Sequence, residues 1–555
     1  MKKLIIIAVG VLAATLFCIK PVTWARKNDV TRNLTVFNRL YKELTTFYVD
    51  SVDADKAITA AIEGMLGDID PYTEYIPQKD RETFEAVSSG EYAGIGSYIT
   101  TRGGDTFISE PSAGSPAAEA GLRAGDRLVV INGDSVRGMA SDEVSKRLKG
   151  QPGTDVSITV WRPYVGADSV KTFRIKRRRI IDNSIPWYGI VRGSVGYIPI
   201  TGFNEKTGTE FREALLDLKK DPRLKALIID LRDNGGGLVE SAVKVLGNFL
   251  PKGSEVLRMR YKGSAANEKI YKTTDKPVDT ELPLAVLINE GTASASEILA
   301  GAIQDLDRGI IVGSRSFGKG LVQITRDLPY NNMLKVTVAK YYIPSGRLIQ
   351  AIDYSHRNAD GTVDRIPDSL TSVFSTRRGR IVRDGGGITP DIVVPEPEID
   401  RLTYNLVRDD WTTDYATRFR ATHDTIPAPE DFVITDEIYS DFKSTIDPAR
   451  LQYDKVCDVI VGRLREAAQN EGYMSDSVAA QLDRLGSMLK HDLNYDLDRR
   501  RPLISRYLGA EIAGRYGYMP ARVRYLITGD AAVDSAASRL TDRRAYDRIL
   551  KPVKK

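Results

Sequence analysis

Residues 289–298 read NEGTASASEI, and they decide the fold because they join a buried strand to a helix. The apolar run over 284–289 predicts the strand, and the apolar helical pattern that begins near Ala295 predicts the helix. A second buried strand is expected over 309–312, after which residues 316–323 read SFGKGLVQ. The chain therefore leaves Ser294 and returns to the same neighbourhood at Lys319.

These two residues suggest a catalytic pair. A serine nucleophile needs a base, and none of the three histidines, His356, His423 and His491, stands in a motif that would aim it at a serine. A lysine can take this role only when it is neutral, which requires a desolvated pocket that lowers its pKa. Glycines on both sides of Lys319 allow other backbone to close around it. The pattern predicts a Ser/Lys hydrolase dyad.

The start of the predicted helix also offers an oxyanion hole. A helix N-terminus leaves unpaired amides and a positive dipole end, so the Ala295 amide can donate to a developing oxyanion. The glycine turn over 235–237 can supply the second donor, with Gly236 and Gly237 as candidates that the sequence does not separate. Ser296, two residues after Ser294, is a rival nucleophile.

Residues 185–395 alternate strands and helices, which implies an α/β core with a partly parallel sheet. Strands are expected over 195–200 and 226–231, around a helix that carries Phe211, Leu215 and Leu218. Ligands in such sheets bind beyond the strand ends, which is where Ser294 and the glycine turn fall.

Residues 87–178 have short alternating strands and many turns, and they resemble a PDZ domain. Gly94, Ile95 and Gly96 stand beside an expected exposed strand edge, where glycines leave backbone amides bare. Such amides can hold a peptide's C-terminal carboxylate while the peptide adds a strand. A PDZ-like spacer that binds nothing is the alternative.

Two helices are expected before this region. Leu34, Phe37 and Leu40 begin an apolar pattern over 31–49, and Asp53 can cap a second helix that Gly67 can end. The apolar face packs either on the body of the protein or in a dimerising arm.

The N-terminus predicts export. Lys2 and Lys3 precede an apolar run over 4–19, as in a secretory signal, with a possible cleavage site over 23–25. A retained anchor and a lipid anchor at Cys18 are the alternatives. All three place the body in the periplasm or cell envelope.

Residues beyond about 400 follow a linker, Pro395–Glu398, and match nothing that can be named from the sequence. Apolar helical stripes at Val456, Val459 and Leu464, and again over 478–489, predict a helical packing core, with a binding groove as the alternative. No function can be assigned to this region.

Composition excludes several classes of function. The 555 residues carry a net charge of only +5, from 79 basic and 74 acidic side chains, which gives no case for nucleic-acid binding. Only Cys18 and Cys457 are present, so no disulfide framework is expected. Neither a clustered Cys/His zinc spacing nor a nucleotide-binding glycine loop occurs. We expect chemistry without a metal or cofactor.

The motifs resemble those of the carboxyl-terminal processing (tail-specific) serine proteases. The matching segments are TASASE over 292–297, FGKG over 317–320, DPYT over 70–73, DLRDNGGG over 230–237, YIPSG over 342–346 and GITPD over 387–391. The 25 residues between Ser294 and Lys319 are the spacing of that family's nucleophile and base. The resemblance covers about residues 30–395.

The resemblance implies further site residues. Gln323, four residues after the lysine, can hydrogen-bond its amine and orient it. Asp230, Arg232 and Glu297 are expected to form a buried charge set that supports the site without donating protons. Asp305 is placed in the same class.

The expected fold is α/β and multidomain. Its parts are a signal peptide or anchor over 1–25, a helical region over 26–86, a PDZ domain over 87–178, a serine protease core of the ClpP and crotonase type over 179–395, and a mainly helical domain over 396–555.

The expected function is a serine endopeptidase of the envelope that recognises the free C-termini of protein or peptide substrates. A homodimer through the two helical regions is a further expectation. A catalytically silent PDZ scaffold and a crotonase-like acyl-transfer enzyme are the alternatives.

Overall fold

The computed structural model describes residues 29–166, 169–263, 267–354, 358, 363–451, 456–489 and 492–551. The predicted signal segment, His356 and His491 lie outside these residues. The chain divides into two compact units. The smaller contains residues 1–78 and 323–337, and the larger contains residues 79–322 and 338–555.

The smaller unit contains the two predicted helices. Residues 29–47 are helical, and α2 (Ala54–Gly67) begins where Asp53 accepts the N–H groups of Asp55 and Lys56. Strand β1 (Glu74–Ile76) pairs antiparallel with the first half of β18 (Met333–Tyr342). The apolar side chains of the first helix are exposed, up to 75% at Phe47.

The PDZ domain contains a six-stranded sheet and a separate strand pair. The sheet runs in the order β3-β4-β5-β7-β8, with β6 beside β5, and β2 pairs with β9. Ile108, Ile131 and Ile158 are fully buried in its core. The elements are β2 (Glu91–Gly94), β3 (Ser97–Arg102), β4 (Asp105–Pro111), α4 (Pro116–Glu119), β5 (Arg127–Ile131), β6 (Asp134–Ser135), α5 (Ser141–Leu148), β7 (Asp155–Trp161), β8 (Val170–Lys176) and β9 (Arg178–Ile181).

The protease core is built on a six-stranded sheet in the order β10-β11-β12-β15-β16-β21. Only the β10–β11 pair is antiparallel, so the prediction of a partly parallel sheet is confirmed. The elements are β10 (Gly189–Val191), β11 (Val195–Pro199), α6 (Thr207–Leu218), β12 (Ala226–Asp230), α7 (Val239–Leu246), β15 (Leu284–Ile288), α8 (Ala295–Asp305), β16 (Ile310–Gly313) and β21 (Ile392–Val393).

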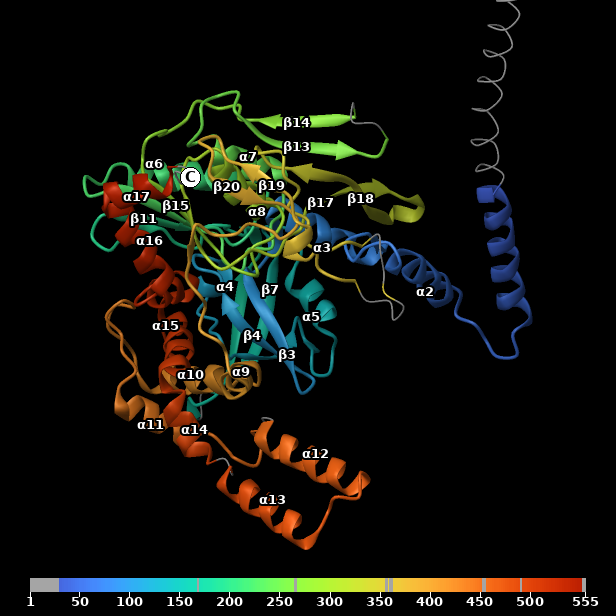
Figure 1. Ribbon diagram of the computed structural model, residues 1–555. Helices are drawn as coiled ribbons and strands as arrows, with labels where there is room; N and C mark the ends of the chain where they lie inside the picture. The colour runs from blue at the N-terminus through green and yellow to red at the C-terminus, as the bar shows by residue number, and fades with distance from the viewer. Residues whose placement is uncertain are drawn as a thin grey trace, which may run out of the picture. The chain divides into compact units, whose positions relative to one another are not determined.

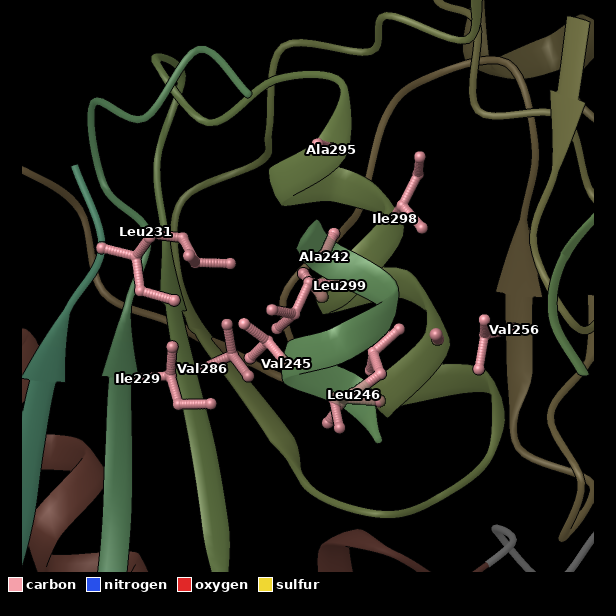
Figure 2. Packing of buried hydrophobic residues seen from close by; sticks show 14 of the residues in the cluster. Ile229, Leu231, Ala242, Val245, Leu246, Val256, Val286, Ala295, Ile298 and Leu299 are labelled. Carbon is pink, nitrogen blue, oxygen red and sulfur yellow. The ribbon is translucent and has the colours of Figure 1, made fainter. Parts of the chain in front are cut away.

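One face of this sheet packs against α6, α7 and α8. Figure 2 shows Ile229 and Val286 on the strands facing Val245 of α7, with Leu299 of α8 close by. Each of these side chains is fully buried. Burial of one such side chain stabilises the fold by roughly 1.5–3 kcal/mol. This packing fixes the start of α8, where Ala295 follows the predicted nucleophile.

The opposite face is covered by the end of the chain. Helices α16 (Ala531–Thr541) and α17 (Arg543–Ile549) lie beside β11 and β15 (Figure 1) and share one buried cluster with the strands. Val533 and Ala536 of α16 are fully buried against strand residues such as Ile228 and Leu287. Residues about 300 positions apart in sequence thus complete one core.

The rest of the C-terminal region is helical, as predicted. Its own core is formed by side chains of α9, α10, α11, α14 and α15. Helix α15 is kinked at Gly517 and Tyr518, where the backbone leaves helical geometry. The helices are α9 (Arg401–Arg408), α10 (Trp411–Thr422), α11 (Asp436–Ser444), α12 (Val456–Asn470), α13 (Asp476–Met488), α14 (Leu493–Arg499) and α15 (Arg501–Leu526).

Helices α12 and α13 pack against each other (Figure 1). Their apolar side chains do not form the buried core that the sequence predicts. Of the predicted apolar stripes on these two helices, Leu482 is buried, while Val456 is 52% and Leu464 is 51% exposed. Two paired helices alone cannot enclose an apolar face, because each covers only one side of the other.

The remaining elements are the strands of a further sheet, a hairpin and one helix. The second half of β18 pairs with β13 (Glu255–Tyr261), which also pairs with β14 (Glu268–Lys272), and β17 (Leu321–Asp327) pairs with β18. Strands β19 (Val373–Ser375) and β20 (Ile381–Arg383) form a small hairpin. Helix α3 (Gln78–Ser89) precedes the PDZ domain.

Candidate active site

Ser294 occupies the junction between β15 and α8, as the sequence predicts. It is the residue immediately before the helix and has φ 56° and ψ −117°, a conformation that non-glycine residues rarely adopt. Such strained backbone costs on the order of 1–3 kcal/mol and persists only where the surroundings impose it. The contacts that impose it here come from Glu297 and Tyr341.

The carboxylate of Glu297 joins the serine segment to the lysine segment. Its Oε2 accepts the backbone N–H of Ser294 at 2.9 Å and that of Lys319 at 2.8 Å. Its Oε1 accepts the N–H of Gly318 at 2.7 Å and the hydroxyl of Ser316 at 2.5 Å. Four donors from two segments therefore converge on one fully buried side chain.

These contacts shift the protonation of Glu297 in opposing directions. Burial raises the pKa of the carboxyl to about 7, although the hydrogen bonds from Ser316, Lys319, Gly318 and Ser294 lower it. Burial penalises the charged form, whereas donors favour it. The group therefore changes its charge near neutral pH.

Tyr341 makes a second bridge between the same residues. Its hydroxyl donates to the backbone carbonyl of Ser294 at 3.2 Å and also to the carbonyl of Lys319. The phenol ring is almost fully buried. The backbones of the predicted nucleophile and base are thus held by one carboxylate and one phenol.

A tight loop brings Lys319 to this position. Gly318 has φ +89°, and a Cβ at this residue would lie 2.4 Å from the Cβ of Ala351. A residue other than glycine would therefore displace the loop. Lys319 itself is half-buried between the buried glycines Gly318 and Gly320.

The glycine turn lies against Ser294, the predicted nucleophile. A Cβ on Gly236 would lie 2.8 Å from the Cβ of Ser294 and 2.9 Å from the amide nitrogen of Ala295. The Gly236 N–H, however, donates to Oδ1 of Asn234 at 2.9 Å.

The two candidate glycines of the turn, Gly236 and Gly237, differ in whether their N–H groups already have a hydrogen-bond acceptor. Among the described residues, the N–H groups of Gly237 and Ala295 have no hydrogen-bond acceptor. Gly237 and Ala295 are therefore the better placed pair of candidate donors. The role of all three residues as oxyanion donors stays a prediction.

Gln323 belongs to the smaller unit, and its Nε2 donates to the hydroxyl of Thr337 at 3.0 Å. The Thr337 hydroxyl also accepts a hydrogen bond from the hydroxyl of Thr73 at 3.4 Å. The expected orientation of the Lys319 amine by Gln323 stays a prediction.

The predicted charge set is divided in the structure. The carboxylate of Asp230 accepts hydrogen bonds from the guanidinium of Arg232 and, at 2.7 Å, from the hydroxyl of Tyr197. The same guanidinium also donates to the carboxylate of Asp530 at 3.0 Å. Glu297 has the separate partners described above, so it does not belong with Asp230 and Arg232. The sequence could not show this, because Asp530 lies 298 residues beyond Arg232.

Asp305 ends α8 far from Ser294, which begins it. Its carboxylate pairs with Arg347 at 2.9 Å and accepts the N–H of Ser345 at 2.9 Å. Both charged side chains are buried to 1% exposure or less. These contacts anchor the end of the helix, and the supporting role of Asp305 in the site stays a prediction.

The predicted peptide-binding residues lie beside an edge strand. Strand β3 is at the edge of its sheet, and Gly94, Ile95 and Gly96 immediately precede it. Among the described residues, the N–H groups of Ile95 and Gly96 have no acceptor. Gly96 has φ +73°, and its Cβ would lie 2.4 Å from that of Ser115.

Several residues of the site were not identified from the sequence. Tyr341, Ser316 and Asn234 act through contacts with residues distant in the chain, and nothing in their local sequence indicates these contacts. Within the described residues, no group of His, Cys, Asp or Glu is arranged to hold a metal ion.

Comparison with known proteins identifies three parts of the chain. Residues 194–355 match peptidase family S41, and residues 107–162 match the PDZ domain. Residues 402–540 match the family described as probable PDZ-protease, C-terminal helical domain. The expectation that nothing beyond about residue 400 could be named was therefore wrong, because that region has a family of its own.

The chain is similar to several known proteins, and the first two below give the same assignment. A probable CtpA-like serine protease of Staphylococcus aureus is 36% identical over 62% of this chain and 68% of its own length. A carboxy-terminal-processing protease of Bartonella bacilliformis is 33% identical over 71% of this chain and 83% of its own. Among solved structures, the photosystem II D1 C-terminal processing protease is 28% identical, with 64% of this chain and 85% of that one covered and a TM-score of 0.34.

One family accounts for the serine that precedes α8, for the PDZ domain and for these relatives. The resemblance noted in the sequence is confirmed, and so is the multidomain fold with its PDZ domain, protease core and helical C-terminal domain. The chain is a serine peptidase, and it belongs to peptidase family S41, among the carboxy-terminal-processing proteases that carry a PDZ domain.

Proposed function

We propose that Ser294 is the nucleophile and Lys319 the general base of this peptidase. The observation that carries the proposal is the double bridge, in which Glu297 and Tyr341 each bind both residues through the backbone. Nucleophile and base must keep a fixed separation for proton transfer, and a shared pair of anchors provides it.

The reaction then follows the two-step course of covalent catalysis. The neutral Lys319 amine accepts the hydroxyl proton as Ser294 Oγ attacks the peptide carbonyl, and it returns a proton to the leaving amine. A water molecule, deprotonated by the same lysine, releases the acyl group. The Ala295 amide and a glycine amide of the 235–237 turn stabilise both tetrahedral intermediates, since backbone donors there cost no reorganisation.

Labelling with a fluorophosphonate probe tests this assignment. The protein should be labelled on Ser294, and Ser294→Ala should remove both the label and peptide hydrolysis. Ser296→Ala is the matched control, because Ser296 is a buried serine two residues away whose hydroxyl donates to the carbonyl of Asn234. Labelling that persists in Ser294→Ala would assign the nucleophile to another residue.

We further propose that the PDZ domain selects substrates by their free C-termini. The unpaired amides of Ile95 and Gly96 support this proposal, because a carboxylate requires donors of this kind. The edge position of β3 adds that an extended peptide has a strand with which to pair. Without an ATPase element, substrates are chains whose tails are already unfolded or exposed.

The proposed location is the periplasm or cell envelope. The basic start and the apolar run over residues 4–19 support export, and a cleaved signal, a retained anchor and a lipid anchor stay open. Among the residues that the structure describes, no helix has the length and apolarity needed to span a bilayer. Cell fractionation with N-terminal sequencing of the mature chain separates the three alternatives.

A homodimer is the last part of the proposal. The exposed apolar side chains of the helix over 29–47 and of α12 and α13 support it, because such faces are usually covered. Sedimentation of the wild-type protein and of a Phe37→Asp, Leu40→Asp double variant tests it.

The silent scaffold and the crotonase-like enzyme are set aside, since the chain belongs to a family of serine peptidases.

A further inference from the structure

A cavity of about 190 Å³ lies between the PDZ domain and the C-terminal helical domain. Its walls come from the PDZ segment around α4, from the residues that follow β7, from α10 and from the kinked part of α15. Its lining includes neither Gly94–Gly96 nor α5, and none of the residues around Ser294. The cavity is therefore separate from both sites proposed above.

The lining of this cavity is positively charged. It includes four guanidinium groups, from Arg123, Arg162, Arg420 and Arg515, and two carboxylates, from Glu110 and Asp126. The net charge of the lining is therefore +2.

Arg162 is neutralised within the PDZ domain. Its guanidinium binds the carboxylate of Asp126 through two hydrogen bonds of 2.7 Å each. Both side chains are buried, so this pair is part of the wall of the cavity and does not contribute free charge.

A second group of charges spans the two domains and is also balanced. Arg522 contacts Glu110 of the PDZ domain at 3.4 Å and Glu511 of α15 at 3.1 Å. Arg515 contacts the same Glu511 at 3.5 Å. Two arginines and two glutamates thus compensate one another.

The positive excess belongs to Arg123 and Arg420. Arg420 lies over the ring of Tyr516, 4.6 Å from its centre, and its acidic neighbour Asp424 is 4.0 Å away and fully exposed to solvent. Burial lowers the pKa of Arg123, and the nearby charges of Arg162 and Arg420 lower it further. The charges of Asp126 and Asp424 raise it, but Asp126 is bound by Arg162 and Asp424 is exposed. Among the described residues, neither of these two guanidinium groups, one from each domain, forms an ion pair with a buried carboxylate.

One residue of the cavity lining, Arg515, also carries an unused donor. The Nε of Arg515 is buried and has no hydrogen-bond partner among the described residues. The side chain is only 3% exposed. Buried N–H groups are nearly always paired in folded proteins, so an isolated one indicates a missing partner.

We propose that this cavity binds a small divalent oxyanion, with inorganic phosphate as the representative ligand. Its volume is below the roughly 300–1,000 Å³ of sites for larger organic ligands, which favours a small ion over a peptide. The two uncompensated guanidinium groups match two negative charges, and the fork of an arginine suits a pair of oxyanion oxygens.

A bound oxyanion would contact Arg123 of the PDZ domain and Arg420 of α10 together. It therefore links the PDZ domain to the helical domain and adds to the ion pairs that already connect them. Its binding does not depend on the proposed dyad, so the two proposals fail independently.

Isothermal titration calorimetry on the full-length protein tests the proposal. Inorganic phosphate is titrated at pH 7.5, with the ionic strength held constant by sodium chloride, and acetate is titrated as the monovalent comparison. We expect saturable phosphate binding, with affinity at least tenfold higher than for acetate. Arg123→Gln and Arg420→Gln should each weaken phosphate binding at least tenfold, and Arg123→Lys should weaken it less.

Arg174→Gln is the matched control. Arg174 lies on β8 of the same PDZ domain, is 81% exposed and pairs with Asp155, outside the cavity. The Arg174→Gln variant should bind phosphate as the wild type does. Thermal melting without phosphate checks that each variant folds. The absence of phosphate binding, equal affinity for acetate, or equal losses in the cavity variants and Arg174→Gln would overturn the proposal.

Discussion

Ser294 and Lys319 donate their backbone N–H groups to the same atom, Oε2 of Glu297, at 2.9 and 2.8 Å. The two proposed catalytic residues are therefore positioned by a third residue that does not need to touch substrate. Glu297 is the third residue after Ser294, so one turn of α8 carries both the nucleophile and the anchor for the base. This relationship leads to the first two predictions.

Glu297→Gln should lower kcat/KM on the order of 10- to 100-fold, because small displacements of catalytic groups have effects of that size. An amide has one acceptor oxygen in place of two, and its NH₂ group would face N–H donors. We expect the loss mainly in kcat, measured with a free-acid peptide substrate. Glu290→Gln, an exposed change seven residues earlier, is the control and should leave kcat unaltered. Equal activity in both variants would remove Glu297 from the positioning role.

The stability that Glu297 contributes should depend on pH. The pKa of its carboxyl is about 7 in the folded protein and 4.5 in the reference state, so the folded state holds the proton more tightly between these values. The contribution is complete below pH 4.5 and is lost as the pH rises to about 7. The unfolding free energy of wild type relative to Glu297→Gln should fall over this window, by at most on the order of 3 kcal/mol. Urea denaturation at pH 4.5, 6, 7 and 8 measures it, and a flat difference would contradict the raised pKa.

Lys319→Arg should be inactive although it keeps the positive charge. A guanidinium stays protonated at any pH at which the protein is folded, so it cannot accept the serine proton. Lys319→Ala should be equally inactive, and wild-type activity should rise with pH through the neutral to alkaline range as the lysine loses its proton. Substantial hydrolysis by Lys319→Arg would mean that another base acts, and His356 would be the first residue to test.

Substrate selection should depend on the loop at Gly96. Gly96→Ala introduces a Cβ that would lie 2.4 Å from that of Ser115, so the amides of Ile95 and Gly96 should move. We expect a higher KM for substrates with a free C-terminal carboxylate, and amidation of the substrate should have a similar effect on the wild type. Gly103→Ala is the control, because its φ is also positive while a Cβ there meets open space. Equal cleavage of free-acid and amidated substrates would reduce the PDZ domain to a spacer.

Removal of residues 527–555 should prevent the protease core from folding. The deletion exposes the sheet face that α16 and α17 cover, including fully buried residues such as Ile228 and Leu287. We expect insoluble or protease-sensitive protein. Val533→Ala is the milder variant and should destabilise by roughly 1–3 kcal/mol, because it leaves a partial cavity in a buried cluster. A soluble, active truncation would show that the core is complete without these helices.

The local features of the catalytic segment were predictable from the sequence. An apolar run followed by small residues and a second apolar pattern defines the strand, the turn and the helix from 284 to 305. The PDZ strands and the glycine turn were predictable for the same reason, since short-range patterns determine them. Predictions failed where a structure depends on contacts between distant segments.

The C-terminal region shows this limit most clearly. The linker Pro395–Glu398 suggested that everything beyond it forms an independent domain, yet α16 and α17 return to the protease sheet. The apolar spacing of α12 and α13 suggested a core, although most of those side chains are exposed. Hydrophobic spacing identifies which face of a helix is apolar, but it does not identify what covers that face. Tyr341 and Asp530 were missed for the same reason.

The position of α16 and α17 also bears on the order in which the protease core can be completed. A chain emerges from synthesis or from a translocation channel with its N-terminus first, and the catalytic segment around Ser294 precedes α16 by more than 230 residues. Until the last helices have emerged, one face of the catalytic sheet has no cover, and the Arg232 partner Asp530 is absent. We therefore expect the protease sheet to gain its final packing only after α16 and α17 have been synthesised.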